Sequence, residues 1–174
     1  LVQIDNLLCF NYISKQKSDF ISVRTTMHCI IILLEGSKII HSDNSNLSLH
    51  SGEMCFLTQN NYFMSERLTK NSRYKSLIIY FDDNFIFDLL LKYKIEESPT
   101  KHNNIITLNY EKDKLLATNI SLFQDYIKNS LDKNLLKLKL EEIILHSIRI
   151  DKNLFSSFIQ AITLTSQDRT RFIL

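Results

Sequence analysis

The sequence predicts an α+β fold in which a closed roll of short antiparallel strands is followed by helices. Up to residue 82, runs rich in Ile, Val, Phe and Tyr alternate with Asn, Ser, Asp and Lys clusters at intervals of about ten residues, which is typical of a meandering antiparallel sheet. After residue 82, apolar residues recur with the spacing of amphipathic helices. A chain of 174 residues with 44% hydrophobic composition can bury one core and carry a helical appendage.

Eight strands are predicted in the first half of the chain, enough to close an antiparallel barrel. They span residues 8–14, 20–26, 28–35, 37–42, 46–50, 53–58, 61–66 and 74–81. The last strand is continuously apolar from Leu77 to Phe81, as expected of a strand covered on both faces, so we place it between the barrel and the helices. Gly36 and Gly52 fall at strand junctions, where a positive φ is often required.

Helical patterns fill most of the second half. Asp82 or Asp83 can cap a short helix that carries four apolar residues between Phe85 and Leu90. The later predicted helices span about 111–130, 134–150, 152–161 and 166–172, the last of them capped and cut short by the end of the sequence.

The second and third predicted helices each carry more than one apolar stripe. On the second helix, Leu116, Ile120 and two later residues form a clean stripe along one face. A second seam, made of residues outside the main stripe of each helix, consists of Leu115, Leu122 and Tyr126 on the second helix and Leu135, Leu138, Glu142 and Leu145 on the third. Because a helix packed on a barrel needs only one buried face, we predict that this second seam binds another copy of the chain. The alternative is that both faces pack within one monomer, in a helical layer or against the tail after residue 151.

Charge and cysteine content exclude several classes of function. The net charge of +2, from 21 basic and 19 acidic side chains, is too small for this piece alone to bind a phosphate backbone. Cys9, Cys29 and Cys55 form no CxxC motif and lie in apolar runs, which fits a reducing cytosol. With no apolar stretch near the ~20 residues of a membrane span, we expect a soluble, cytoplasmic protein that does not enter a membrane.

The search for catalytic or metal-binding chemistry is largely negative. The five histidines form no HxH, HxxxH or HExxH motif, and His41, His50 and Glu53 are one partial match to a barrel-type metal site. We therefore predict no catalytic residues, no metal and no cofactor. Side chains that could meet a ligand inside the barrel are the cationic, imidazole and phenol groups of the strand region, namely Arg24, His28, Lys38, His50, Tyr62 and Arg73.

Two segments carry a resemblance to a known family. Residues 31–40 (IILLEGSKII) and 47–57 (LSLHSGEMCFL) resemble the strand, Gly, strand, x-x-G-[DE]-x-x-[FL] track of cupin-like N-terminal domains in AraC-type regulators. The order of later elements is similar across nearly the whole chain, and the sequence looks most like activators of virulence and type III secretion genes. Gln59-Asn60-Asn61 replaces the Pro-Gly turn common in such barrels, and a chain without Trp lacks the stacking residue of a sugar sensor.

The resemblance implies a division of the chain and a set of partners. It implies a jelly-roll, cupin-like barrel over residues 1–82, a helical dimerisation subdomain over 83–163, and a linker or the start of a helix-turn-helix domain over 164–174. The protein would form a homodimer and bind DNA only through a C-terminal half. A small apolar or fatty-acid-like ligand, or a protein antagonist, would modulate it. The alternative is a small cupin-type metal-dependent enzyme, such as an isomerase or a dioxygenase, against which the missing HxH motif argues.

Overall fold

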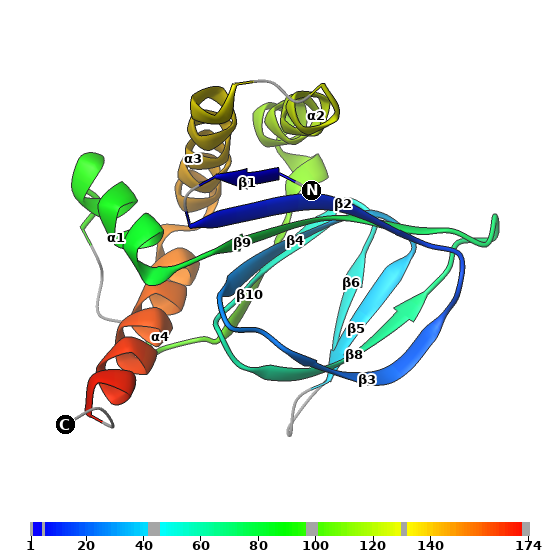
Figure 1. The fold of residues 1–174 in the computed structure, drawn as a ribbon, viewed down its shortest axis with the longest axis horizontal. Coiled ribbons are helices and arrows are strands. Elements are labelled where there is room, and N and C mark those ends of the chain that lie inside the picture. The colour runs from blue at the N-terminus through cyan, green and yellow to red at the C-terminus, as the bar shows by residue number, and fades with distance from the viewer. Residues whose placement is uncertain (1, 5, 42–45, 97–100, 130–131, 172–174) are drawn as a thin grey trace.

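Two antiparallel sheets face one another to form a barrel, and helices pack along one side of it (Figure 1). The computed structural model describes residues 2–4, 6–41, 46–96, 101–129 and 132–171. One sheet has six strands in the order β1-β2-β9-β4-β7-β10, and the other has four in the order β3-β8-β5-β6. The strands are β1 (Val2–Ile4), β2 (Leu7–Ser14), β3 (Ser18–Arg24), β4 (His28–Glu35), β5 (Ser37–His41), β6 (Asn46–His50), β7 (Glu53–Leu57), β8 (Asn61–Arg67), β9 (Tyr74–Phe81) and β10 (Ile105–Asn109).

The six-stranded sheet is covered on both faces, as predicted for its central strand. In β9, Leu77, Ile79 and Phe81 belong to the core beneath the helices, whereas Ile78 and Tyr80 contact the core inside the barrel. This division follows from the period of two in a strand, which sends successive side chains to opposite faces. The sheet therefore separates a helix-facing core from a barrel core.

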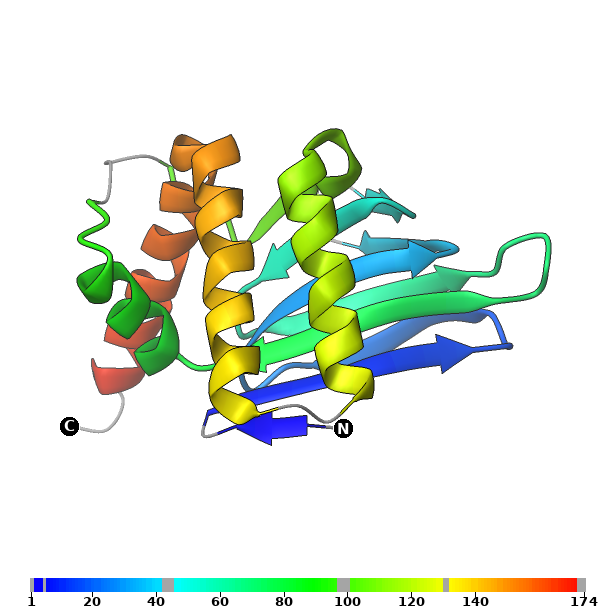
Figure 2. The same cartoon turned by 90° about the horizontal axis from the view of Figure 1, so that it is seen from above.

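The helices form a layer on the six-stranded sheet and a group at its end. Figure 2 shows α2 and α3 side by side over the sheet, with α1 and α4 gathered at one end of the molecule. Asp82, Asp113 and Asp132 cap α1, α2 and α3 by accepting hydrogen bonds from backbone N–H groups of the first turn. The elements are α1 (Asp83–Lys92), the 3-10 turn η1 (Tyr110–Lys112), α2 (Lys114–Lys128), α3 (Lys133–Ile150) and α4 (Lys152–Arg171).

The α+β barrel-and-helix fold predicted from the sequence is confirmed, together with both glycine turns. Gly36 has φ +92° and Gly52 has φ +88°, in the region that favours glycine. A Cβ at Gly36 would lie 2.6 Å from the carbonyl oxygen of Arg67. Both turns therefore require glycine for backbone conformation, and Gly36 requires it for space as well.

Two features of the second half differ from the prediction. The strand β10, which pairs with β7, lies where only helices and loops were expected. The helices predicted over 152–161 and 166–172 are one continuous helix, α4. Between the two predicted helices, the hydroxyls of Thr163 and Thr165 donate to the carbonyls of Ile159 and Ala161 four residues earlier, so these polar groups are satisfied within the helix.

The predicted division of the chain at residue 82 stays a prediction, although the sheet draws its last strand from beyond that point. Within the described segments, none of the helices is both long enough and apolar enough to cross a membrane.

Candidate functional site

A cavity of about 220 Å³ lies between the two sheets. Its walls combine an apolar majority with a smaller group of polar side chains. The apolar lining residues are Ile21, Val23, Cys29, Ile31, Leu57, Met64 and Ile78. The polar lining residues are Tyr12, Ser18, Thr25, Lys38, Glu66 and Tyr80. Such a mixture is typical of a small-molecule site, where apolar walls enclose the ligand and a few polar groups orient it.

A buried ion pair forms the polar centre of this cavity. The Nζ of Lys38 donates to Oε1 of Glu66 at 2.7 Å, and both side chains are at least nine-tenths buried. The hydroxyl of Tyr12 donates to the other carboxylate oxygen at 3.2 Å. Lys38 also lies 5.4 Å from the centre of the Tyr74 ring, a cation–π distance.

Strand register brings this pair together. Lys38 on β5 is the direct partner of Glu66 on β8, and both occupy positions that alternate towards the interior. In β8 the inward positions are Tyr62, Met64 and Glu66, two residues apart. The inward charge of Glu66 therefore follows from the same period that buries its apolar neighbours.

The other titratable groups near the cavity are held in their neutral forms. Burial raises the pKa of Tyr80 and of the Cys55 thiol to about 12, and that of Cys29 well above its usual value. The pKa of Tyr12 is also raised, first by burial and then by the adjacent Glu66 carboxylate. At neutral pH the cavity therefore presents one cation, one anion and several uncharged donors.

Of the six side chains predicted to face a ligand, only Lys38 lines this cavity. Tyr62 points inward, but its hydroxyl donates to the carbonyl of Thr58 at 2.8 Å, at one end of β7. Arg24, His50 and Arg73 are exposed on the surface. Glu66 and Tyr12 were not among the predicted ligand residues, and the signal that could have revealed Glu66 is the inward alternation of β8.

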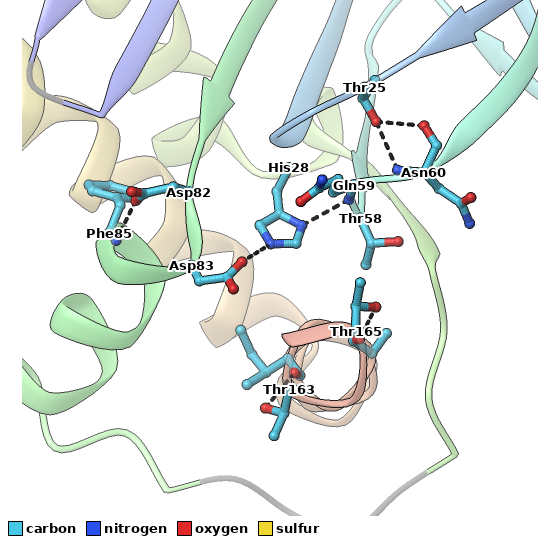
Figure 3. A network of polar contacts seen from close by, with 12 residues as sticks. Thr25, His28, Thr58, Gln59, Asn60, Asp82, Asp83, Phe85, Thr163 and Thr165 are labelled. Carbon is cyan, nitrogen blue, oxygen red and sulfur yellow. Dashed lines mark hydrogen bonds and ion pairs between the residues drawn. The ribbon is translucent and has the colours of Figure 1, made fainter. Parts of the chain in front are cut away.

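His28 lies on the opposite, helix-facing side of the six-stranded sheet (Figure 3). Its Nδ1 accepts from the backbone N–H of Gln59 at 3.0 Å, so the proton of the neutral ring sits on Nε2, which is 2.6 Å from Oδ1 of Asp83. The buried ring also contacts Phe81 and Phe158. His28 thus connects the β7–β8 turn, the start of α1 and the helix α4, and these contacts give it a structural role.

The partial metal motif is not assembled. His41 pairs with Asn46 and Ser37 pairs with His50, so the two histidines lie at opposite ends of the β5–β6 hairpin. Glu53 accepts from the backbone N–H of His50. Across the described segments, no three His, Cys, Asp or Glu side chains converge in a way that could hold a metal ion.

The predicted second seam on α2 and α3 is partly exposed. Its four exposed residues, termed here the leucine seam, are Leu115 (60% exposed), Leu122 (41%), Leu135 (45%) and Leu138 (51%). Tyr126 and Leu145 are instead half-buried against the domain's own core. Glu142 lies at the surface, where a hydrogen bond from Lys139 at 2.7 Å lowers the pKa of its carboxyl.

Solved structures of the regulator ToxT share this fold. The chain is similar to apo ToxT K231A from Vibrio cholerae, with 13% identity and a TM-score of 0.59, over 89% of this chain and 60% of that one. It is also similar to unsaturated fatty acid bound wild-type ToxT, with 12% identity and a TM-score of 0.56, over 86% of this chain and 57% of that one. At these identities the likeness shows the fold alone, and the chain spans about three fifths of the length of ToxT.

Sequence comparison supplies the family. No match is found among curated proteins. The family described as the ExsA N-terminal regulatory domain matches residues 28–158, and this confirms the resemblance to N-terminal domains of AraC-type regulators. Since that match covers well over half of the sequence, the chain belongs to the family of ExsA N-terminal regulatory domains.

Proposed function

We propose that this chain is the regulatory and dimerisation domain of a cytoplasmic AraC-type transcription activator that controls virulence or type III secretion genes. The family match points to a regulatory domain rather than an enzyme. DNA would be bound by a C-terminal pair of helix-turn-helix units outside these 174 residues. The net charge of only +2 supports this assignment of DNA binding to another part of the protein.

The observation that carries the proposal is the leucine seam. Four leucines on two adjacent helices are each exposed by 41–60%, so a monomer leaves them in water. A second copy of the chain could bury them through a two-fold interface, in which the same patch is used by both subunits. Such a dimer would set two DNA-binding halves at the spacing of paired half-sites.

The test of this interface is the mass in solution across a dilution series. We expect the unaltered chain to form a concentration-dependent dimer, and the double variant Leu122→Lys/Leu138→Lys to remain monomeric, because four charges would be buried at the interface. The matched control is Leu91→Lys, which alters a leucine on α1 that is 77% exposed and outside the seam. This control should dimerise like the unaltered chain.

Two results would count against the proposal. A dimer that persists in the double variant would show that another face forms the interface. An unaltered chain that is monomeric at all concentrations would remove self-association from this domain and leave dimerisation to the remainder of the protein.

The modulator would be a small apolar or fatty-acid-like ligand in the barrel, or a protein antagonist on the surface. The barrel cavity supports the first version, and the fatty acid bound to ToxT shows that a protein of this fold holds such a molecule. Native mass spectrometry of the purified chain and its thermal shift with added ligands separate the two versions. A retained small molecule or a raised melting temperature favours a ligand, and their absence favours a protein partner.

A further inference from the structure

The barrel cavity differs from a simple anion-binding pocket because its cation already has a counter-ion. Lys38 is the basic residue of the cavity lining, and its ammonium group is 2.7 Å from the carboxylate of Glu66. Tyr12 donates to the second oxygen of that carboxylate, so the pair is hydrogen-bonded on both sides. The described lining residues therefore carry no net charge.

This charge balance decides which head group the cavity accepts. An ionised carboxylate placed beside Lys38 would bring a second negative charge close to Glu66 in a poorly solvated space. Like charges repel more strongly there than in water, and desolvation of the incoming ion adds to the cost. An uncharged head group avoids both penalties.

The groups around the cavity also fit an uncharged head group that is both donor and acceptor. The ammonium of Lys38 has a third proton beyond those directed to Glu66 and towards Met64, whose sulfur lies 3.9 Å from Nζ. The carboxylate oxygens of Glu66 have lone pairs beyond the bonds from Lys38 and Tyr12. One primary amide or hydroxyl could accept a hydrogen bond from the ammonium of Lys38 and donate one to the carboxylate of Glu66.

The volume limits the length of the ligand. At about 220 Å³, the cavity is smaller than the roughly 300–1,000 Å³ of pockets that enclose drug-sized ligands. Its walls beyond the ion pair are mainly aliphatic, including Ile21, Val23 and Ile78. These properties favour a short apolar tail.

We propose that the barrel cavity binds a small uncharged amphiphile, with a donor–acceptor head group on the Lys38–Glu66 pair and a short aliphatic tail, and that Glu66 excludes carboxylate ligands. As a statement about regulation, this proposal rests on the proposed function and narrows its ligand from apolar or fatty-acid-like molecules to uncharged amphiphiles. As a statement about binding, it concerns the cavity alone.

The experiment compares octanamide with octanoate, which share a chain length and differ in charge at neutral pH. Dissociation constants are measured by NMR titration of this chain at pH 7, where amide shifts of Cys29, Ile31 and Met64 report occupancy of the cavity. We expect the unaltered chain to bind octanamide at least tenfold more tightly than octanoate. Glu66→Gln, which leaves the charge of Lys38 unbalanced, should reverse this order.

A second variant keeps the proposal testable if Glu66→Gln does not fold. In Lys38→Met/Glu66→Leu neither charge is left alone, and the affinity for octanamide should fall at least fivefold because its head group loses its partners. Tighter binding of octanoate than of octanamide by the unaltered chain would overturn the proposal. Octanamide affinity unchanged in the double variant, or no shift at the three reporter amides with either compound, would also overturn it.

The same samples separate this proposal from the proposed function. Dimerisation of the unaltered chain is measured by its mass in solution without any ligand. Failure of dimerisation with intact octanamide binding would contradict only the regulatory interface. Failure of octanamide binding with intact dimerisation would contradict only the ligand class.

Discussion

Among single residues, Lys38 and Glu66 depend on one another for stability. Lys38→Met would leave the Glu66 carboxylate buried with only the Tyr12 hydroxyl as a described partner, and we expect it to lower the free energy of unfolding by about 3–5 kcal/mol. In Lys38→Met/Glu66→Leu the loss should be smaller than in the single variant, because no unpaired charge remains. Urea unfolding measures both.

The exposed Arg24 provides the control for that comparison. Arg24→Met removes an exposed cation from the four-stranded sheet that also contains Lys38. This change should alter the free energy of unfolding by less than about 0.5 kcal/mol. A double variant that is less stable than the single one would show that the unpaired charge of Glu66 is not the cause of the loss.

The two turn glycines should differ in their tolerance of a side chain. Both have φ near +90°, so Gly36→Ala and Gly52→Ala should each cost about 1–3 kcal/mol of strain. The loss should be larger at Gly36, because the obstructing atom there is the backbone oxygen of Arg67, whereas at Gly52 it is the flexible carboxyl of Glu111. Thermal unfolding of both variants checks this order, and Gly52→Ala/Glu111→Ala, which removes the steric contact, should be at least as stable as Gly52→Ala.

At the scale of elements, a buried carboxylate joins the end of α1 to α3. Glu141 accepts from Nζ of Lys92 at 2.7 Å and from the hydroxyl of Tyr93 at 2.8 Å, and its side chain is only 7% exposed. These bonds cross between segments 48 and 49 residues apart in sequence. They hold the C-terminal turn of α1 against the helical layer.

The neighbouring Glu142 is a matched control for this contact. Glu141→Gln, which removes the charge that both donors share, should cost about 1.5–3 kcal/mol and reduce the protection of α1 amides from hydrogen exchange. Glu142→Gln, at a side chain 39% exposed with a surface partner, should cost less than about 1 kcal/mol. Equal losses, or unchanged exchange in α1, would contradict this role of Glu141.

Elements with a clear period could be predicted from the sequence. The stripes of α2 and α3 and the two-sided apolar run of β9 indicated both their secondary structure and their place in the layers. The strand β10 was missed because it is only five residues long and lies among helical patterns, away from the run of strands in the first half of the chain. Its partner β7 lies about fifty residues earlier, so the pairing is a property of the tertiary structure.

For the whole molecule, the site was less predictable than the fold. Composition and alternation indicated a barrel with an apolar interior, yet only one of the six proposed ligand residues lines the cavity. Which charged side chain meets Lys38 depends on the register of β5 against β8, which local sequence does not encode. Cationic and imidazole side chains considered one at a time therefore did not predict the cavity lining. A charged residue at an inward position of an alternating strand, such as Glu66, is the better predictor.

The whole fold should lose stability at alkaline pH, because several buried thiols and phenols must stay neutral. Burial raises the pKa of Cys9, Cys55, Tyr62, Tyr80 and Tyr110 to about 12, from 9.0 for a thiol and 10.0 for a phenol. A raised pKa means that the unfolded chain releases these protons first. The stability they contribute is therefore fully present below pH 9 and is lost as the pH rises towards 12.

The urea midpoint should stay level between about pH 7 and 9 and then fall steadily. In Tyr80→Phe, which lacks one such phenol, the urea midpoint should fall less steeply above pH 10 than in the unaltered chain. An equal slope in the two proteins would show that Tyr80 does not contribute to this loss of stability.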